Sequence, residues 1–173
     1  MASSPPLPAA DIAERLKARF GADLPEAADD HGQAVVRTTP ERYRDVIATL
    51  RDDEDLAFDF FDFTTAVDLK EEGFDVVTQL YSTSRRHHVR VKVRCDAQEP
   101  RCPSVHDLYA GADWFERETW ELFGIVFEGH PQLVKLVLPE QFEGFPGRKS
   151  FELMSRHVKP WPGAVEGEEE EDE

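Results

Sequence analysis

The chain has 173 residues, of which 40% are hydrophobic and 10% aromatic, and this predicts one domain with a sizeable core plus tails. Its net charge of −16 argues against nucleic-acid binding, which needs a basic surface. No apolar run approaches the roughly 18 residues that a membrane-spanning helix requires, and the first residues lack the basic and apolar regions of a secretory signal. We therefore expect membrane association only through a partner.

The N-terminal part of the chain predicts a lead-in, a helix, a strand and a second helix. Residues 1–9 have the composition of a disordered lead-in. Apolar side chains recur every fourth residue over residues 11–20, which is typical of a short helix. Residues 34–37 read as a short strand. Thr39 can then cap a second helix that has Pro40 in its first turn.

Three strands follow, at residues 56–63, 74–81 and 88–94. A Glu-Glu-Gly turn separates the first two, so they should pair antiparallel. The third alternates strictly between valine and a basic residue, which predicts one buried face and one wet face. The basic side chains of this region either face solvent or dock on an acidic neighbour; they are Arg85, Arg86, Arg90, Lys92 and Arg94.

The remainder of the chain predicts a long helix, a last strand and an arm. Ser104 can cap a helix that runs to about Phe123, where Gly124 ends it. Residues 133–138 read as the last strand, which closes a domain over residues 10–139. Residues 140–163 are rich in Pro and Gly and read as an extended partner-binding arm. Residues 164–173 are an acidic tail that should be disordered.

The order of these elements predicts an α+β fold. A helix precedes the succession β-α-β-β-β-α-β, which is the ferredoxin-like order with one extra strand. We expect a mixed, mainly antiparallel sheet with the helices largely on one face, followed by the extended C-terminal arm.

The long helix carries an unusual set of polar and aromatic residues. At 100° per residue, Glu116 and Glu118 lie at the border of its apolar face, and Arg117 points away from the core. Trp114 and Glu121 lie on the far side, and Trp120 lies on a flank. Tryptophans outside a core face are typical of protein interfaces, although cover by this chain's own loop or arm would also account for them.

The carboxylates and His130 allow three interpretations. They could be acid–base catalysts, metal ligands, or anchors that accept hydrogen bonds from backbone amides or arginines of this chain or a neighbour. Gly129 and Pro131 enclose His130 in a turn, which the histidine could hold by bonding the local backbone. A free-standing metal-dependent hydrolase would use Glu118, Glu121 and His130. The pattern favours the structural or docking interpretation, with no catalytic, cofactor-binding or metal-binding residue assigned.

Cys95 and Cys102 are the only cysteines. Two thiols cannot hold an ordinary four-cysteine iron–sulfur cluster, and they are interpreted as an unlinked pair in a reducing compartment. A bridge between them is geometrically possible but has no positive support.

The stretch from Ser104 to Phe151 resembles the C-type subunit of proton-pumping NADH:quinone oxidoreductase, respiratory complex I. Gly124 and Arg148 are part of this similarity, and the other matching residues are Glu116, Arg117, Glu118, Trp120, Glu121, Gly129, His130, Pro131 and Lys149. The chain departs from the family at three positions. The family commonly has Asp at position 121, Asp or Asn at 132, and a basic residue at 134.

The resemblance implies a non-catalytic scaffold in the hydrophilic arm of complex I. Such a chain would hold no flavin or iron–sulfur cluster of its own and would pack against the D-type subunit near the quinone site. The complex itself would transfer electrons from NADH to quinone. The chain would lie peripherally on the cytoplasmic side of the inner membrane, held there by the other subunits. The same module in a membrane-bound hydrogenase or an F420H2 dehydrogenase is the close alternative.

Overall fold

The computed structural model describes residues 7–24 and 26–152. Its order of helices and strands is α1 (Ala9–Phe20), η1 (Gly21–Asp23), β1 (Glu26–Asp30), β2 (Gln33–Thr38), α2 (Pro40–Asp52), β3 (Phe60–Asp68), η2 (Lys70–Glu72), β4 (Phe74–Ser82), β5 (His87–Cys95), β6 (Arg101–Pro103), α3 (Ala112–Phe123) and β7 (Val126–Glu128). The acidic tail, most of the lead-in and residues 153–163 of the predicted arm lie outside the described residues.

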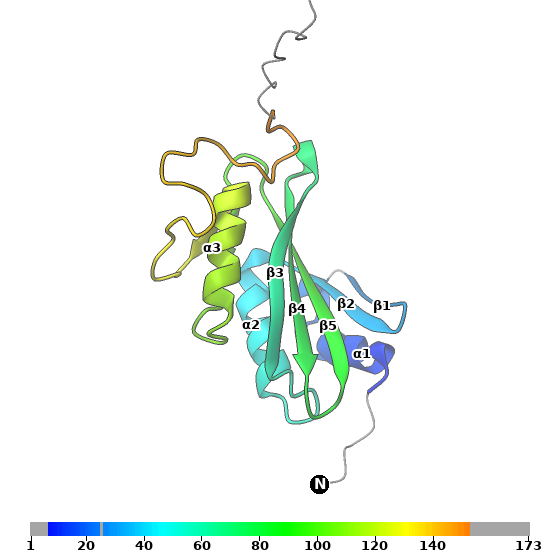
Figure 1. Ribbon diagram of the computed structural model, residues 1–173. Helices are drawn as coiled ribbons and strands as arrows, with labels where there is room; N and C mark the ends of the chain where they lie inside the picture. The colour runs from blue at the N-terminus through cyan, green and yellow to red at the C-terminus, as the bar shows by residue number, and fades with distance from the viewer. Residues whose placement is uncertain (1–6, 25, 153–173) are drawn as a thin grey trace, which may run out of the picture.

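Five strands form one mixed sheet in the order β1-β2-β5-β4-β3 (Figure 1). The β2–β5 pair is parallel, and α2 follows β2 on the way to the antiparallel meander β3-β4-β5. The strands β6 and β7 make a separate parallel pair. The predicted class, α+β with a mixed and mainly antiparallel sheet, is confirmed.

The helices cover the face of the sheet that carries the valines of β5. Val89, Val91 and Val93 are each 0% exposed, whereas the basic side chains between them reach the opposite face. In Figure 1, α2 lies behind the sheet, α1 beside the β1–β2 end, and α3 along β3 at the other end. A hydrogen bond between two buried hydroxyls ties α2 to the sheet, since Tyr43 of α2 bonds Thr78 of β4 at 2.7 Å.

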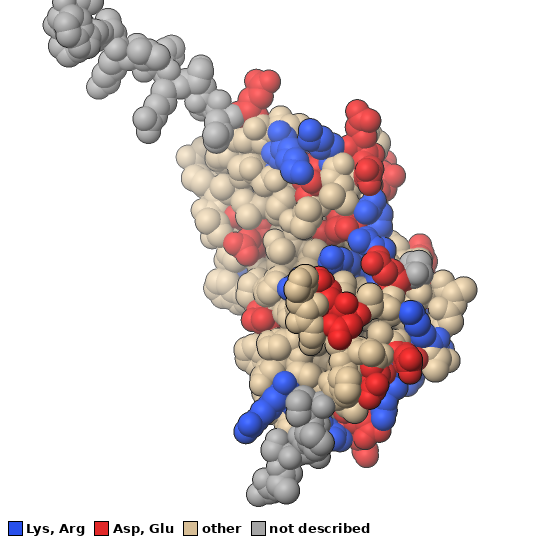
Figure 2. Space-filling view, turned by 90° about the vertical axis from the view of Figure 1, so that its right-hand side faces the viewer, with Lys and Arg blue, Asp and Glu red and all other residues tan. Residues whose placement is uncertain are grey.

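The basic face of β5 binds acidic and amide side chains of its own sheet. Asp75 of β4 accepts hydrogen bonds from Arg37 at 2.9 Å and from Arg94 at 2.5 Å. Arg90 bonds Gln79 at 3.1 Å. The side of the molecule that carries β1 and β2 shows acidic and basic residues interspersed (Figure 2). Among the described residues, no helix is long and apolar enough to cross a membrane.

Three predicted elements differ from the structure. The strand predicted at residues 56–63 begins only at Phe60, because Ala57 adopts a left-handed backbone that precedes the strand. The helix predicted from Ser104 begins at Ala112, since residues 104–111 form turns held by side chains. No strand forms at residues 133–138; the last strand within the described residues is β7, which lies earlier in the chain.

The strand β1 has no counterpart in the sequence prediction. Its residues, Glu-Ala-Ala-Asp-Asp, have poor strand propensity, and its pairing with β2 in a hairpin overrides that preference. As an edge strand it carries acidic side chains, which discourage pairing with a further chain.

Candidate functional site

Glu116 lies inside the domain rather than at the border of the helix. Its side chain is 0% exposed, and it accepts hydrogen bonds from the Ser104 hydroxyl and, at 2.8 Å, from the Val105 amide. Burial raises the pKa of Glu116 to about 7, although these two donors act in the opposite direction. The carboxylate therefore fixes the turn before α3 to the helix itself.

Polar and ring contacts lead from Ser104 to two histidines. Because the Ser104 hydroxyl donates to Glu116, it accepts from Nδ1 of His106 at 3.0 Å. The His106 ring lies 5.7 Å from the ring of His130, centroid to centroid. The His130 side chain is 0% exposed, and its Nε2 lies 3.2 Å from the Asp113 carboxylate. Its Nδ1 accepts the Gln132 amide at 3.1 Å, so both ring nitrogens of His130 hold the turn after β7.

Glu121 is also buried, at 3% exposure, even though helical geometry places it on the far side of the helix. Its carboxylate accepts hydrogen bonds from three consecutive backbone amides. Val137 donates at 2.8 Å and Leu138 at 2.9 Å, and Leu136 is the third donor. The helix directs Glu121 away from the sheet, but residues 133–138 fold over it. Their amides bind a carboxylate, which is why they do not pair as a strand.

Two cations bind the carbonyls of the same segment. Arg117 donates to the Val134 carbonyl at 3.2 Å and to the Lys135 carbonyl at 3.4 Å. The Lys135 ammonium donates to three further carbonyls, at 2.6–3.3 Å, which belong to Pro139, Glu140 and Phe142. We call residues 132–152 the C-terminal segment. Side chains satisfy its backbone where secondary structure does not.

Arg148 ties the C-terminal segment to the end of α3. Its Nε donates to the Phe123 carbonyl at 2.6 Å, and its guanidinium lies over the rings of Phe74 at 5.0 Å and Phe145 at 4.6 Å. Gly124 ends α3 with a φ of 74°, and a Cβ at this position would lie 2.7 Å from Arg148. A glycine therefore serves both the left-handed turn and the close approach of this arginine.

Three large apolar side chains are exposed on this region. Trp114 is 61% exposed and lies on α3, and Val134 at 41% and Val137 at 65% lie on the C-terminal segment. Arg117 connects the two parts, because its guanidinium lies 5.8 Å from the Trp114 ring while it holds the Val134 carbonyl. We call these three apolar residues the outer patch. Trp120, by contrast, is partly buried against the core.

The other residues that matched the family in the sequence make fewer contacts. Glu118 is half-buried on α3, Gly129 has a φ of 86° in the turn after β7, and Pro131 is exposed. Lys149 donates its backbone amide to Asp68 at 2.7 Å. Among residues 7–24 and 26–152, no group of three or more His, Cys, Asp or Glu side chains is placed to hold a metal ion.

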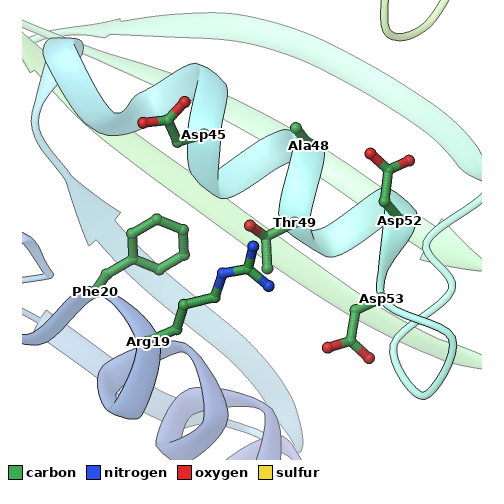
Figure 3. A pocket seen from close by; sticks show the side chains of 7 residues that line it. All are labelled: Arg19, Phe20, Asp45, Ala48, Thr49, Asp52 and Asp53. Carbon is green, nitrogen blue, oxygen red and sulfur yellow. The ribbon is translucent and has the colours of Figure 1, made fainter.

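A pocket of about 480 Å³ lies away from all of these residues, between the end of α1 and the helix α2. In Figure 3, Arg19 reaches from α1 toward Thr49, the Phe20 ring lies on the side of Asp45, and Asp52 and Asp53 stand at the far end. None of the signature residues lines it. Cys95 and Cys102 are both buried free thiols near the opposite end of α2.

Comparison with known proteins identifies the family. The model of the respiratory-chain NADH dehydrogenase 30-kDa subunit matches residues 36–157, which is more than half of the chain. This chain belongs to that family. The C-type subunit of NADH-quinone oxidoreductase from Roseiflexus sp. strain RS-1 is 39% identical over 151 residues, covering 86% of this chain and 87% of the relative.

Two solved structures share the fold of this family member. A trypsin-resistant fragment of Nqo5 superposes with a TM-score of 0.60 at 29% identity, covering 70% of this chain and 98% of the fragment. A chain of the membrane-bound sulfane sulfur reductase, an archaeal respiratory membrane complex, gives a TM-score of 0.74 at 23% identity. The superposition covers 95% of this chain and 97% of the chain from the reductase complex, and this second likeness concerns the fold alone.

Proposed function

We propose that this chain is a non-catalytic assembly subunit in the hydrophilic arm of proton-pumping NADH:quinone oxidoreductase. It packs against the D-type subunit near the quinone site and lies peripherally on the cytoplasmic side of the inner membrane, where the other subunits hold it. The flavin and iron–sulfur clusters belong to those subunits. Membership in the family of the 30-kDa subunit supports this proposal.

The observation that carries the proposal is the use of the signature side chains. Glu116, Glu121 and Arg117 each bind backbone groups of their own chain, which leaves them poorly placed for acid–base chemistry on a substrate. Glu121 and Arg117 hold the backbone of the two valines of the outer patch. An exposed tryptophan, with two exposed valines on the segment that Arg117 and Glu121 hold to the same helix, has the composition of an interface hot spot.

The test replaces Trp114 with alanine in the full chain and measures co-purification with the D-type subunit from solubilised membranes. Truncating a hot-spot tryptophan costs about 2 kcal/mol or more, so recovery of this partner should fall by roughly thirtyfold. Phe60→Ala is the matched control, because Phe60 is 51% exposed but lies on β3. Unchanged recovery in Trp114→Ala, or equal loss in both variants, would contradict docking through the outer patch.

Arg117 is a poor choice for this test. It holds the carbonyls of Val134 and Lys135, so Arg117→Glu would release the C-terminal segment as well as change the surface charge. A defect in that variant would not distinguish docking from local unfolding.

Related assemblies are distinguished by what accompanies the chain. A hydrogenase or F420H2-oxidising module recovered in place of the NADH-oxidising module would assign the same scaffold to a different complex. The metal-dependent hydrolase has less support, because Glu121 and His130 are engaged with separate backbone segments. Stoichiometric zinc or manganese in the purified chain would favour it.

A further inference from the structure

The junction between η2, β4 and the C-terminal segment encloses a pocket of about 370 Å³. Its cationic residues are Lys70, Arg148 and Lys149, and its carboxylates are Asp68 and Glu71. Phe74, Ala97, Gln98 and Ser150 complete the lining. This is a local excess of positive charge in a chain whose net charge is −16.

The two carboxylates of the pocket, Asp68 and Glu71, differ in burial and in what they bind. Asp68 is 7% exposed, and its two oxygens accept the backbone amides of Lys70 at 2.6 Å and Lys149 at 2.7 Å. Asp68 therefore builds the wall by joining β3 to the C-terminal segment. Glu71 is exposed at the rim.

Arg148 is held in a fixed orientation at the pocket. Its guanidinium lies over the rings of Phe74 and Phe145, and its Nε is already bonded to the Phe123 carbonyl. A planar guanidinium with a fixed plane presents its remaining donors to a carboxylate at little entropic cost. Lys70 and Lys149 add two further cationic residues to the same lining.

We propose that this pocket, which we call the cationic pocket, receives an acidic side chain of a neighbouring subunit. A volume of about 370 Å³ holds a whole Asp or Glu side chain with part of its backbone, and Phe74 offers an apolar wall to its methylene groups. The C-terminal segment forms one side of the cationic pocket and also carries two residues of the outer patch, so one partner could bind both. This inference rests on the proposed assembly function and adds the chemistry of a second contact.

Zero-length carbodiimide cross-linking of the purified complex tests the proposal, because it couples lysine ammonium groups only to carboxylates in direct contact. We expect Lys70 or Lys149 to be joined to an Asp or Glu of another subunit, as identified by mass spectrometry of the peptides. The variants Lys70→Arg and Lys149→Arg retain the charge and lose the amine. The link should disappear in them while the complex stays intact.

Charge reversal provides the energetic measurement. Lys70→Glu with Lys149→Glu should lower recovery of the partner roughly three- to thirtyfold, because each exposed ion pair contributes up to about 1 kcal/mol. The loss should be greatest at low salt, where screening is weakest. The control is Lys17→Glu, made singly and together with Arg19→Glu, which makes the same charge changes on the exposed side of α1.

Two results would overturn the proposal. Cross-links from Lys70 and Lys149 only to this chain's own carboxylates, including Glu166 to Glu173 of the tail, would show that no partner occupies the cationic pocket. Equal recovery in the reversal variants and their controls would do the same. Both differ from failure of the proposed function, in which the wild-type chain would elute without any other component of complex I.

Discussion

At the scale of single residues, two buried carboxylates explain how irregular backbone is held in this domain. Glu116 binds the turn before α3, and Glu121 binds the segment after β7. Each lies at 3% exposure or less, and each accepts hydrogen bonds from backbone amides that have no strand or helix partner. A buried polar group costs free energy unless it is paired, so each carboxylate and its amides must be kept together.

The stability of the domain should depend on the ionisation of Glu116. Its pKa in the folded chain is about 7, above the ordinary value of 4.5, so the folded state binds the proton more tightly than the unfolded state. The contribution of Glu116 to the free energy of unfolding is then fully present below pH 4.5 and is lost as pH rises through 7. The free energy of unfolding of the wild-type chain should therefore fall by about 3 kcal/mol over this pH range, and this part of the decrease should be absent in Glu116→Gln. Urea unfolding of both proteins between pH 4 and pH 8 measures it, and parallel profiles would refute the assignment.

Loss of the Glu121 carboxylate should release the C-terminal segment. Three amides would lose their acceptor in Glu121→Ala, at a cost of about 1–3 kcal/mol. Amide hydrogen exchange should accelerate at Leu136, Val137 and Leu138 and remain unchanged in β4. Glu118→Ala is the control on the same helix, since Glu118 is half-buried and these three amides donate to Glu121 instead. The idea fails if exchange at these three amides is the same in both variants.

At the scale of secondary-structure elements, side chains decide where strands and helices begin. The periodicity of β5 placed its buried valines correctly, because every second residue of a half-buried strand meets the core. Residues 133–138 are as apolar as a strand, yet the carboxylate of Glu121 takes their amides. Local pattern cannot predict this, since the competing acceptor lies on another element.

The connection between β3 and β4 offers a test at this scale. Gly73 has a φ of 95°, and a Cβ there would lie 2.2 Å from the Cys95 carbonyl oxygen. Gly32, in the β1–β2 hairpin, has a φ of 82° with no atom within 4 Å of such a Cβ. Both alanine variants carry the cost of a left-handed backbone, about 1 kcal/mol. Gly73→Ala should lower the Tm well beyond Gly32→Ala, and equal Tm values would show that the contact relaxes freely.

At the scale of the whole molecule, charge is unevenly distributed along the chain. The last eight residues contain seven carboxylates, and a like-charge run of this kind usually stays solvated. We expect deletion of residues 166–173 to leave co-purification with the D-type subunit unchanged. The same preparation shows whether the full complex forms, and its loss on deletion would mean that the tail takes part in assembly.

The sequence by itself determined the fold class, the two faces of β5 and the family, because these depend on periodicity and on a contiguous signature. Helical geometry also placed Trp114 on the outside correctly. The tertiary structure alone decided what Glu116, Glu121 and Arg148 bind, since their partners lie in segments 11 to 25 residues away. A carboxylate at a given helical angle faces solvent or protein according to what folds over it. The segments that pack over the helix therefore determine whether the carboxylate is exposed or buried.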